Sequence, residues 1–363
     1  MSQDRLNEMT EKHLTTLLTK GDDDAKKAIN TLLDESKGRR DFFLKLGEGM
    51  QSKFHSNGHV LLQTPKGDYT LHNNALTQLS ERYKIGSRFV KTLTNGQQQW
   101  QRDLIAHNLN EFSIHNERSR FLMRSVNNEI RGVLTDQYKI MDSAEIASKF
   151  LEEAMKSGAV FAGGYNSGLN MWLEVVKRQM IQVETENNGT ISLIFGGRFK
   201  SADYGNGALD MRVFFIQTVC LNGLVGETVL HERHLGEKLP EGYNFSRKIH
   251  AAHTKLMMMK VAEMTKNLFS DERIASEIRR IKKASKVEID GHEYLERLNK
   301  NGLILKGELE EAEQVMINNR TRDGVQGEMT LWKLSQSISA IARKKEPIRQ
   351  RELMEIGGKL LFN

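Results

Sequence analysis

The order of sequence patterns predicts an α+β fold: a central antiparallel β meander with hairpins, packed helices, and helical N- and C-terminal segments. Helical spacing of apolar residues fills 1–50, turn-bounded alternating runs fill the centre, and helical spacing returns beyond Pro240. The length of 363 residues allows one large domain or two ordinary ones. We expect a helical segment over 1–50, an α+β core over 51–240, and a basic helical region over 241–363 that packs on the core.

The first 50 residues are predicted to form helices, because Leu6, Leu14 and Leu18 lie near helical spacing. The run Gly-Asp-Asp-Asp at 21–24 predicts a break between two helices, since acidic residues suit the first turn of the second one.

The next segment predicts a β-hairpin followed by a helix. The runs 59–64 and 69–72 flank the turn-rich tetrapeptide Pro-Lys-Gly-Asp at 65–68. Leu76, Leu79 and their neighbours then show helical spacing over 75–83.

The centre of the chain predicts most of the strands. Residues 121–126 and 129–134 form a hairpin whose two-residue loop, Asn127-Asn128, tolerates left-handed backbone. Asp142 to Glu145 predicts a capped helix start, and Gly158 its C-terminal stop.

Three long strands then predict an antiparallel meander. They lie at 173–184, 190–199 and 209–219, and the turn-rich segments 187–189 and 203–207 separate them. Helical spacing resumes beyond Pro240 and is clear over 329–343, where Leu331, Leu334, Ile338 and Ile341 form one face.

Positive charge is concentrated in the segment 245–286, which holds eleven basic and four acidic residues. Its balance of +7 exceeds the +6 of the whole chain, which is the distribution that a polyanionic partner requires. The four cations at 279, 282, 283 and 286 follow i, i+3, i+4, i+7 spacing, and isoleucines lie on the opposite side of the same helix. The basic residues of this segment that we expect to bind nucleic acid are Arg247, Lys248, Arg279, Arg280, Lys282, Lys283 and Lys286. The alternative is an ordinary solvated helix face.

A second basic set lies on or near the central strands. In a strand with period 2, Arg120 and Arg124 share one face. Arginines on an open sheet face would follow phosphates, and nearby aromatics such as Tyr138, Phe199 and Tyr204 would stack on single-stranded bases. The candidate residues are Arg118, Arg120, Arg124, Arg131, Lys139, Arg198, Lys200 and Arg212. The alternative is that they are ordinary solvent-facing strand positions.

No catalytic, cofactor or metal motif stands out, so no catalytic residue, cofactor or metal ligand is assigned. The chain has no P-loop signature, and its Gly-Gly pairs at 163–164 and 196–197 indicate strand bulges or close backbone approach. His231 and His234 lack the i, i+4 spacing of a zinc helix, which favours surface histidines. The single cysteine, Cys220, excludes an intramolecular disulfide and indicates a buried thiol at a strand end.

Composition predicts a protein of a reducing, aqueous compartment. No run approaches 18 uncharged apolar residues, and residues 1–30 are polar, so neither a membrane span nor a secretory leader is expected. Three prolines and the absence of low-complexity tracts argue against a disordered chain.

Four separate stretches of the sequence, taken in their order along the chain, form a recognisable pattern. They are Arg-Gly-Val-Leu-Thr-Asp-Gln-Tyr-Lys-Ile-Met-Asp at 131–142, Ser-Ala-Asp-Tyr-Gly-Asn-Gly-Ala-Leu at 201–209, Cys-Leu-Asn-Gly-Leu-Val at 220–225, and a terminal helix that begins Thr-Leu-Trp at 330–332. In this order they resemble the phage/plasmid-like protein family known as domain of unknown function 932, over roughly residues 60–360. That resemblance implies a host-cytoplasm protein that serves mobile-element DNA. Strand order and basic placement are also similar to phage single-strand annealing proteins of the Red-beta, Erf and RecT class.

These observations together predict a non-enzymatic phage or plasmid protein that binds single-stranded DNA and assists annealing, recombination or replication. We expect a homo-oligomer, with duplex DNA or RNA as other nucleic-acid partners and a phage exonuclease or replication protein as a candidate protein partner. One rival hypothesis is a metal-dependent nuclease with ligands among Asp136, Asp142, Asp203 and Asp210. Another is a protein that docks on a host factor through the Met-rich helix at 257–259.

Overall fold

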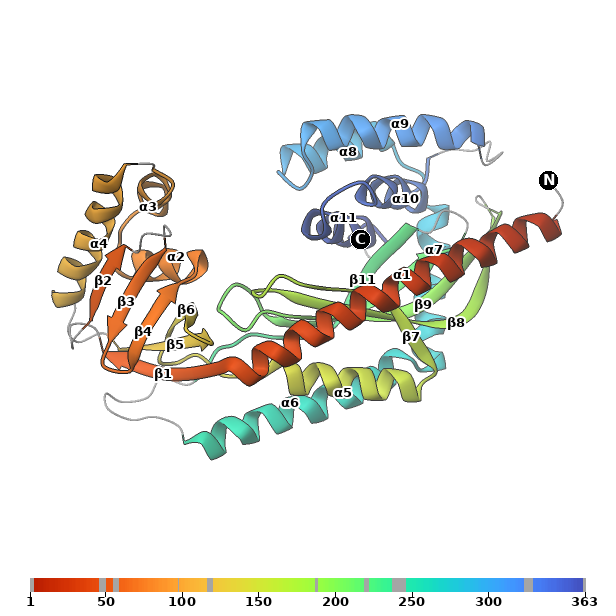
Figure 1. Cartoon of the computed structure of the whole chain (residues 1–363). Helices are drawn as coiled ribbons and strands as arrows, with labels where there is room; N and C mark the ends of the chain where they lie inside the picture. The colour runs from red at the N-terminus through yellow and green to blue at the C-terminus, as the bar shows by residue number, and fades with distance from the viewer. Residues whose placement is uncertain are drawn as a thin grey trace.

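Two β-sheets with helices packed around them form a mixed α/β molecule in the computed structural model (Figure 1). The structure describes residues 3–45, 50–54, 59–96, 98–115, 120–186, 189–218, 222–236, 246–322 and 329–361. Both sheets are built of hairpins and meanders, and helical segments stand at both ends, so the predicted α+β class is confirmed.

The six-stranded sheet and its three helices form what we call the small lobe. Its strand order is β1-β5-β6-β4-β3-β2, antiparallel except for the β4–β6 pair. The strands are β1 (Arg39–Lys45), β2 (Gln51–Phe54), β3 (Val60–Thr64), β4 (Gly67–Leu71), β5 (Arg120–Val126) and β6 (Glu129–Thr135). The helices are α2 (Asn73–Arg82), α3 (Ser87–Thr94) and α4 (Gln99–Ile114). Apolar residues of α2, α3 and α4 share one core with this sheet.

The five-stranded sheet is the centre of the large lobe, and it is an antiparallel meander in the order β11-β10-β9-β8-β7. Its strands are β7 (Ala159–Asn166), β8 (Met171–Thr185), β9 (Gly189–Ser201), β10 (Leu209–Gln217) and β11 (Asn222–Glu232). Its later helices are α5 (Ser143–Lys156), α6 (Arg247–Leu268), α7 (Asp271–Lys286), α8 (Gly291–Lys300), α9 (Lys306–Arg322), α10 (Leu331–Ala342) and α11 (Pro347–Lys359).

Helices cover both faces of this sheet, as period-2 alternation in β10 illustrates. Phe215 belongs to a core shared with α5, α6 and α7, whereas its neighbours Phe214 and Ile216 belong to a core shared with α8 to α11. The five-stranded sheet therefore offers no broad open face.

A single long helix, α1 (Gln3–Gly38), runs along the large lobe beside β7 and leads into β1 of the small lobe (Figure 1). The predicted break at 21–24 is wrong, because the helix is continuous there. Gly21 is buried where α1 crosses β7, and a Cβ at this position would collide with the Ala162 carbonyl. A Cβ on Gly164 would likewise lie 2.5 Å from the Ala25 Cα. Glycine is needed at this crossing for close backbone approach.

The predicted hairpins, the central meander and the helices at 75–83 and 329–343 are confirmed. Asn127 takes the expected positive φ, 54°, and Gly158 ends α5 with a φ of 79°. The predicted capping role of Asp142 is wrong, because its side chain makes no cap hydrogen bond and pairs with arginines. The predicted helical segment over 1–50 is wrong beyond Gly38, because residues 39–45 form β1. Sequence analysis also missed β2, β7, β11, α3 and α4.

Among the described residues, no helix has both the length and the apolar character to cross a membrane.

Candidate nucleic-acid interface

The outward face of α7 carries the predicted basic stripe. Ser270 caps the helix by accepting a hydrogen bond from the Arg273 backbone N–H, at 3.2 Å. The four stripe residues, Arg279, Lys282, Lys283 and Lys286, are all exposed. Within the described part of the chain, three of them form no ion pair, and Lys286 pairs with Glu186 at 2.5 Å. The stripe therefore has cationic groups available to a partner.

The inward face of α7 holds the stripe in place. Ile281 is buried, and Ile274 and Ile278 pack against the core of the large lobe. Their side chains line a small enclosed space with strand residues that include Phe195 and Phe215. The predicted apolar seam is thus confirmed, and it fixes α7 on the five-stranded sheet.

Arg280 does not belong to the exposed stripe. It is half-buried and bonds to Glu227 of β11 and to Glu277, at 3.2 Å from the latter. Arg273 reaches the same two carboxylates at 2.7 and 2.9 Å. Burial raises the pKa of Glu277, and the two arginines oppose this shift without overcoming it. Arg280 therefore fastens α7 to β11 and is not a free phosphate contact.

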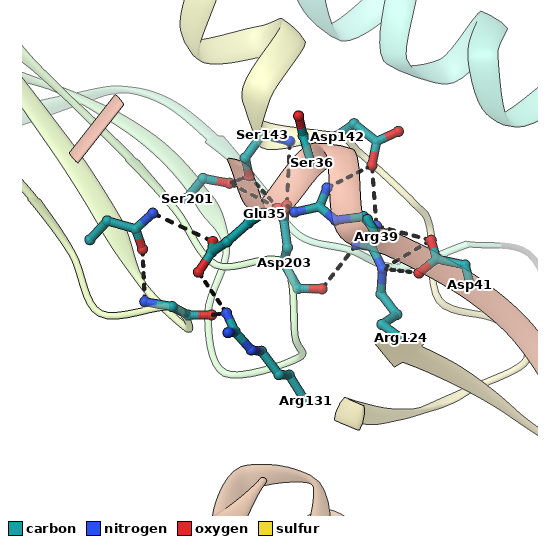
Figure 2. A network of polar contacts seen from close by, with 12 residues as sticks. Glu35, Ser36, Arg39, Asp41, Arg124, Arg131, Asp142, Ser143, Ser201 and Asp203 are labelled. Atoms are coloured by element: carbon teal, nitrogen blue, oxygen red, sulfur yellow. Dashed lines mark hydrogen bonds and ion pairs between the residues drawn. The ribbon is translucent and has the colours of Figure 1, made fainter. Parts of the chain in front are cut away.

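Arg124 is a correction to the predicted open face, because it is fully buried. Its guanidinium contacts Asp41 at 3.0 Å and Asp142 at 3.1 Å, and donates to the Asp203 carbonyl at 3.0 Å (Figure 2). Burial lowers the pKa of Arg124, but Asp41 and Asp203 more than compensate, so the pKa lies well above its ordinary value. Here the charge stabilises the junction between the two lobes.

Arg39 and Asp203 complete this junction (Figure 2). Arg39 pairs with Asp203 at 2.8 Å and with Asp142 at 2.9 Å. Asp203 also accepts a hydrogen bond from the Ser143 hydroxyl. Burial raises the pKa of Asp203, but Arg39 and Arg124 outweigh this effect and hold it below its ordinary value. The network joins β1 and β5 of the small lobe to the start of α5 and the loop after β9.

Arg131 lies at the edge of the same junction, where it is half-buried. It pairs with Glu35 of α1 at 2.6 Å (Figure 2) and with Glu129 at 2.8 Å. Its role in the structure is to tie β6 to α1.

Arg198 and Arg212 are likewise engaged inside the large lobe. Arg198 is 3% exposed and pairs with Glu355 of α11 at 2.8 Å. Arg212 pairs with Asp210 at 2.7 Å and with Glu355 at 3.4 Å. Burial lowers the pKa of Arg198. Because α11 covers this part of the sheet, the expected open groove is absent from the described residues here.

The remaining predicted residues lie on different elements and connecting segments. Arg120 is half-buried, with its guanidinium 4.3 Å from the centre of the Phe43 ring. Lys139 and Lys200 are half-buried, and Lys248 is exposed at the start of α6. Arg118 and the side chain of Arg247 lie outside the described residues.

The prediction that aromatic side chains near the strands stack on bases is also wrong. Phe199 and Tyr204 are buried, at 0% and 2% exposure, and Tyr138 is half-buried with its hydroxyl donating to the Asp203 carbonyl at 3.0 Å. These rings lie inside the protein or at the lobe junction, so they present no surface for bases.

The histidine prediction holds only in part. His231 is exposed, but His234 is buried and its ring stacks on that of Tyr138, with centroids 4.7 Å apart. Burial lowers the pKa of His234. Cys220 lies outside the described residues. In the part of the chain that the structure describes, no three His, Cys, Asp or Glu side chains are placed to hold a metal ion.

Of the carboxylates considered for a nuclease, Asp142 and Asp203 come together, but Arg39 pairs with both and Arg124 pairs with Asp142. Asp210 pairs with Arg212, and Asp136 is exposed elsewhere. No observation in the described residues favours the nuclease hypothesis.

Sequence analysis missed a second basic region, the segment 82–102. It contains five basic residues and no acidic residue. The signal is a local charge of +5 over these residues, which is smaller than the +7 of the segment 245–286. The structure places this segment on α3 and its flanks, in the small lobe.

Comparison with known proteins adds no relative: no family model, no curated protein and no solved structure matches this chain. The resemblance to the phage/plasmid-like family therefore stays a prediction.

Proposed function

We propose that the protein binds single-stranded DNA, with the exposed stripe of α7 as the phosphate contact. The observation that carries this proposal is the stripe itself, in which Arg279, Lys282 and Lys283 are exposed and have no ion pair within the described residues. Each phosphate that such a cation neutralises releases counterions, which supplies affinity without sequence preference. The family resemblance favours single-stranded DNA of a phage or plasmid as the substrate, in annealing, recombination or replication.

The packing of α7 supports a binding role. A cation on a mobile segment loses conformational entropy on binding, whereas one on an anchored helix is already placed. Ile281 and Arg280 hold α7 on the sheet from its inner side. The stripe therefore presents a row of charges at fixed spacing, and one strand of a polyanion can follow it.

The test is a fluorescence-anisotropy titration of nuclease-treated protein with labelled single-stranded DNA at several salt concentrations. The variant is Lys282→Glu with Lys283→Glu, and the matched control is Lys20→Glu with Lys27→Glu, because these two lysines are also exposed on a helix. We expect the α7 variant to bind at least tenfold more weakly and its log-log salt slope to fall by about 1.4, at roughly 0.7 per phosphate contact on a single strand. Equal affinity and slope in the variant and the control would refute the proposal.

A second candidate role, contact with another copy of this chain, is favoured by α6. Ile249, Leu256 and Met259 are 39%, 49% and 62% exposed. Their spacing of seven and three residues places them on one helical face, as in a helix–helix seam. Met257, in contrast, is buried, so the Met-rich run contributes to both the core and the surface.

Light scattering after size-exclusion chromatography tests this second role. We expect the wild type to self-associate and the variant Leu256→Glu with Met259→Glu to elute at the mass of a single chain. A wild-type mass that equals one chain at every concentration across a hundredfold range would refute self-association through α6.

A further inference from the structure

Helices α2 and α3 in the small lobe are joined by a tight turn with defined geometry. Tyr83 ends α2, and Lys84 takes a left-handed φ of 60°. The Lys84 N–H donates to the Glu81 carbonyl at 3.0 Å, and the Ile85 N–H donates to the Ser80 carbonyl at 2.8 Å. This pair of hydrogen bonds is the Schellman pattern of a helix C-terminus. Gly86 then caps α3, so only a few residues separate the two helices.

The two helices share a buried core. Leu79 and Tyr83 of the α2 end are 0% and 3% exposed, and Val90 and Leu93 of α3 are 3% and 6% exposed. These four side chains belong to the core of the six-stranded sheet, against which α2 packs directly. A short turn containing glycine and a shared buried core are features of the connection in a helix-turn-helix unit.

The opposite face of α3 is open to solvent and polar. An open hollow there is lined by Ser87, Arg88, Lys91, Thr92 and Asn95. All five are exposed, and neither Arg88 nor Lys91 forms an ion pair with any residue that the structure describes. These residue types are suited to DNA, since Arg and Lys contact guanine, Asn contacts adenine, and hydroxyls contact phosphates.

Charge and size both match duplex DNA. The segment 82–102 carries +5 and includes no acidic residue, although Glu81 and Asp103 border it and reduce the local charge to +3 over 81–103. Helix α3 has 8 residues and lies at the edge of the small lobe beside α4 (Figure 1). An α-helix with its side chains is about 10–12 Å across, so α3 can enter the major groove, which is about 12 Å wide.

We propose that α2 and α3 form a helix-turn-helix unit that binds duplex DNA, with α3 in the major groove. Arg88 and Lys91 contact phosphates, and Asn95 reaches a base edge from the C-terminal end of α3. This proposal does not depend on α7, which lies in the other lobe and is assigned to single-stranded DNA.

The experiment is an anisotropy titration of the full-length protein with a labelled 20-base-pair duplex and, separately, with one of its strands. The variant is Arg88→Ala with Lys91→Ala, and the control is Lys20→Ala with Lys27→Ala. We expect the variant to bind the duplex at least tenfold more weakly, with a salt slope reduced by about 1.8, at roughly 0.9 per phosphate contact on B-DNA. Its affinity for the single strand should change less than twofold.

Three outcomes would overturn the proposal: no duplex binding by the wild type, equal duplex binding by the variant and the control, or a loss confined to the single strand. The last outcome would instead assign the surface to base stacking, for which Phe89 and Trp100 are available at 46% and 59% exposure. A thermal melt checks the fold of each variant, and we expect no change because Arg88 and Lys91 are exposed.

A crossed measurement separates this proposal from the function proposed for α7. The variant Lys282→Glu with Lys283→Glu should keep its duplex binding and lose single-strand binding. If this α7 variant loses duplex and single-strand binding while the α3 variant keeps both, all DNA binding belongs to α7 and a separate site on α3 is refuted.

Discussion

The lobe junction and the outer face of α7 are both rich in basic residues, yet they use their charge in opposite ways. At the junction, Arg39 and Arg124 are buried, and each contacts two carboxylates (Figure 2). On α7, Arg279, Lys282 and Lys283 have no ion pair within the described residues. Clustered charge therefore indicates a binding surface only where the fold leaves it without internal partners. The same test selects Arg88 and Lys91 on α3.

The largest expected effect comes from removing a junction arginine. We expect Arg124→Met to lower the free energy of unfolding by about 3–5 kcal/mol, because Asp41 and Asp203 would lose a buried counter-charge. Urea unfolding at neutral pH measures this change. Arg279→Met on α7 is the matched control, and we expect it to stay within about 0.5 kcal/mol of the wild type. Similar losses of unfolding free energy in both variants would show that the buried and exposed arginines contribute equally to stability, contrary to this expectation.

The second effect is the acid sensitivity of the junction. The folded pKa of Asp203 lies below its ordinary value, so its stabilising contribution is present above the unfolded pKa and is lost as the pH falls through the folded pKa. We expect Asp203→Asn to cost about 2 kcal/mol at neutral pH. The difference between variant and wild type should shrink on acidification below about pH 4. A difference that is constant with pH would contradict the assignment.

A smaller effect of opposite sign is expected on the inner side of α7. Burial raises the folded pKa of Glu277, so its contribution to stability is greatest at low pH and declines as the pH rises through the folded pKa. We therefore expect Glu277→Gln to gain stability relative to the wild type as the pH is raised from acid to neutral. Unfolding free energies measured at several pH values would show this trend, and a relative loss on raising the pH would exclude it.

The smallest effect on stability is expected for the stripe itself. Lys282→Ala with Lys283→Ala should change the free energy of unfolding by no more than about 0.5 kcal/mol, because both side chains are exposed. The same variant should bind single-stranded DNA more weakly, as anisotropy would measure. Unchanged stability with weakened binding would show that the stripe serves binding and not folding. A loss of stability would indicate that the stripe has internal partners.

Local patterns in the sequence located the hairpins, the long strands of the meander and several of the helices. Helical spacing determined α7 with its isoleucine seam and its four outward cations, and turn residues such as Asn127 located the hairpins. These features depend on interactions within a few residues, so they can be inferred without knowing what packs on them. The break expected near Gly21 failed because that glycine serves a contact with β7, which is distant in the sequence.

Only the tertiary structure decided which basic residues are available. Period 2 in β5 correctly places Arg120 and Arg124 on one side of the strand, but it does not say that α5 and the loop after β9 meet Arg124 there. In the same way, nothing near Arg198 in the sequence indicates Glu355 of α11, which lies 157 residues away. The sequence by itself determined the elements and the total charge. The packing of distant segments determined which charges are neutralised internally, because burial and pairing depend on partners that local periodicity does not identify.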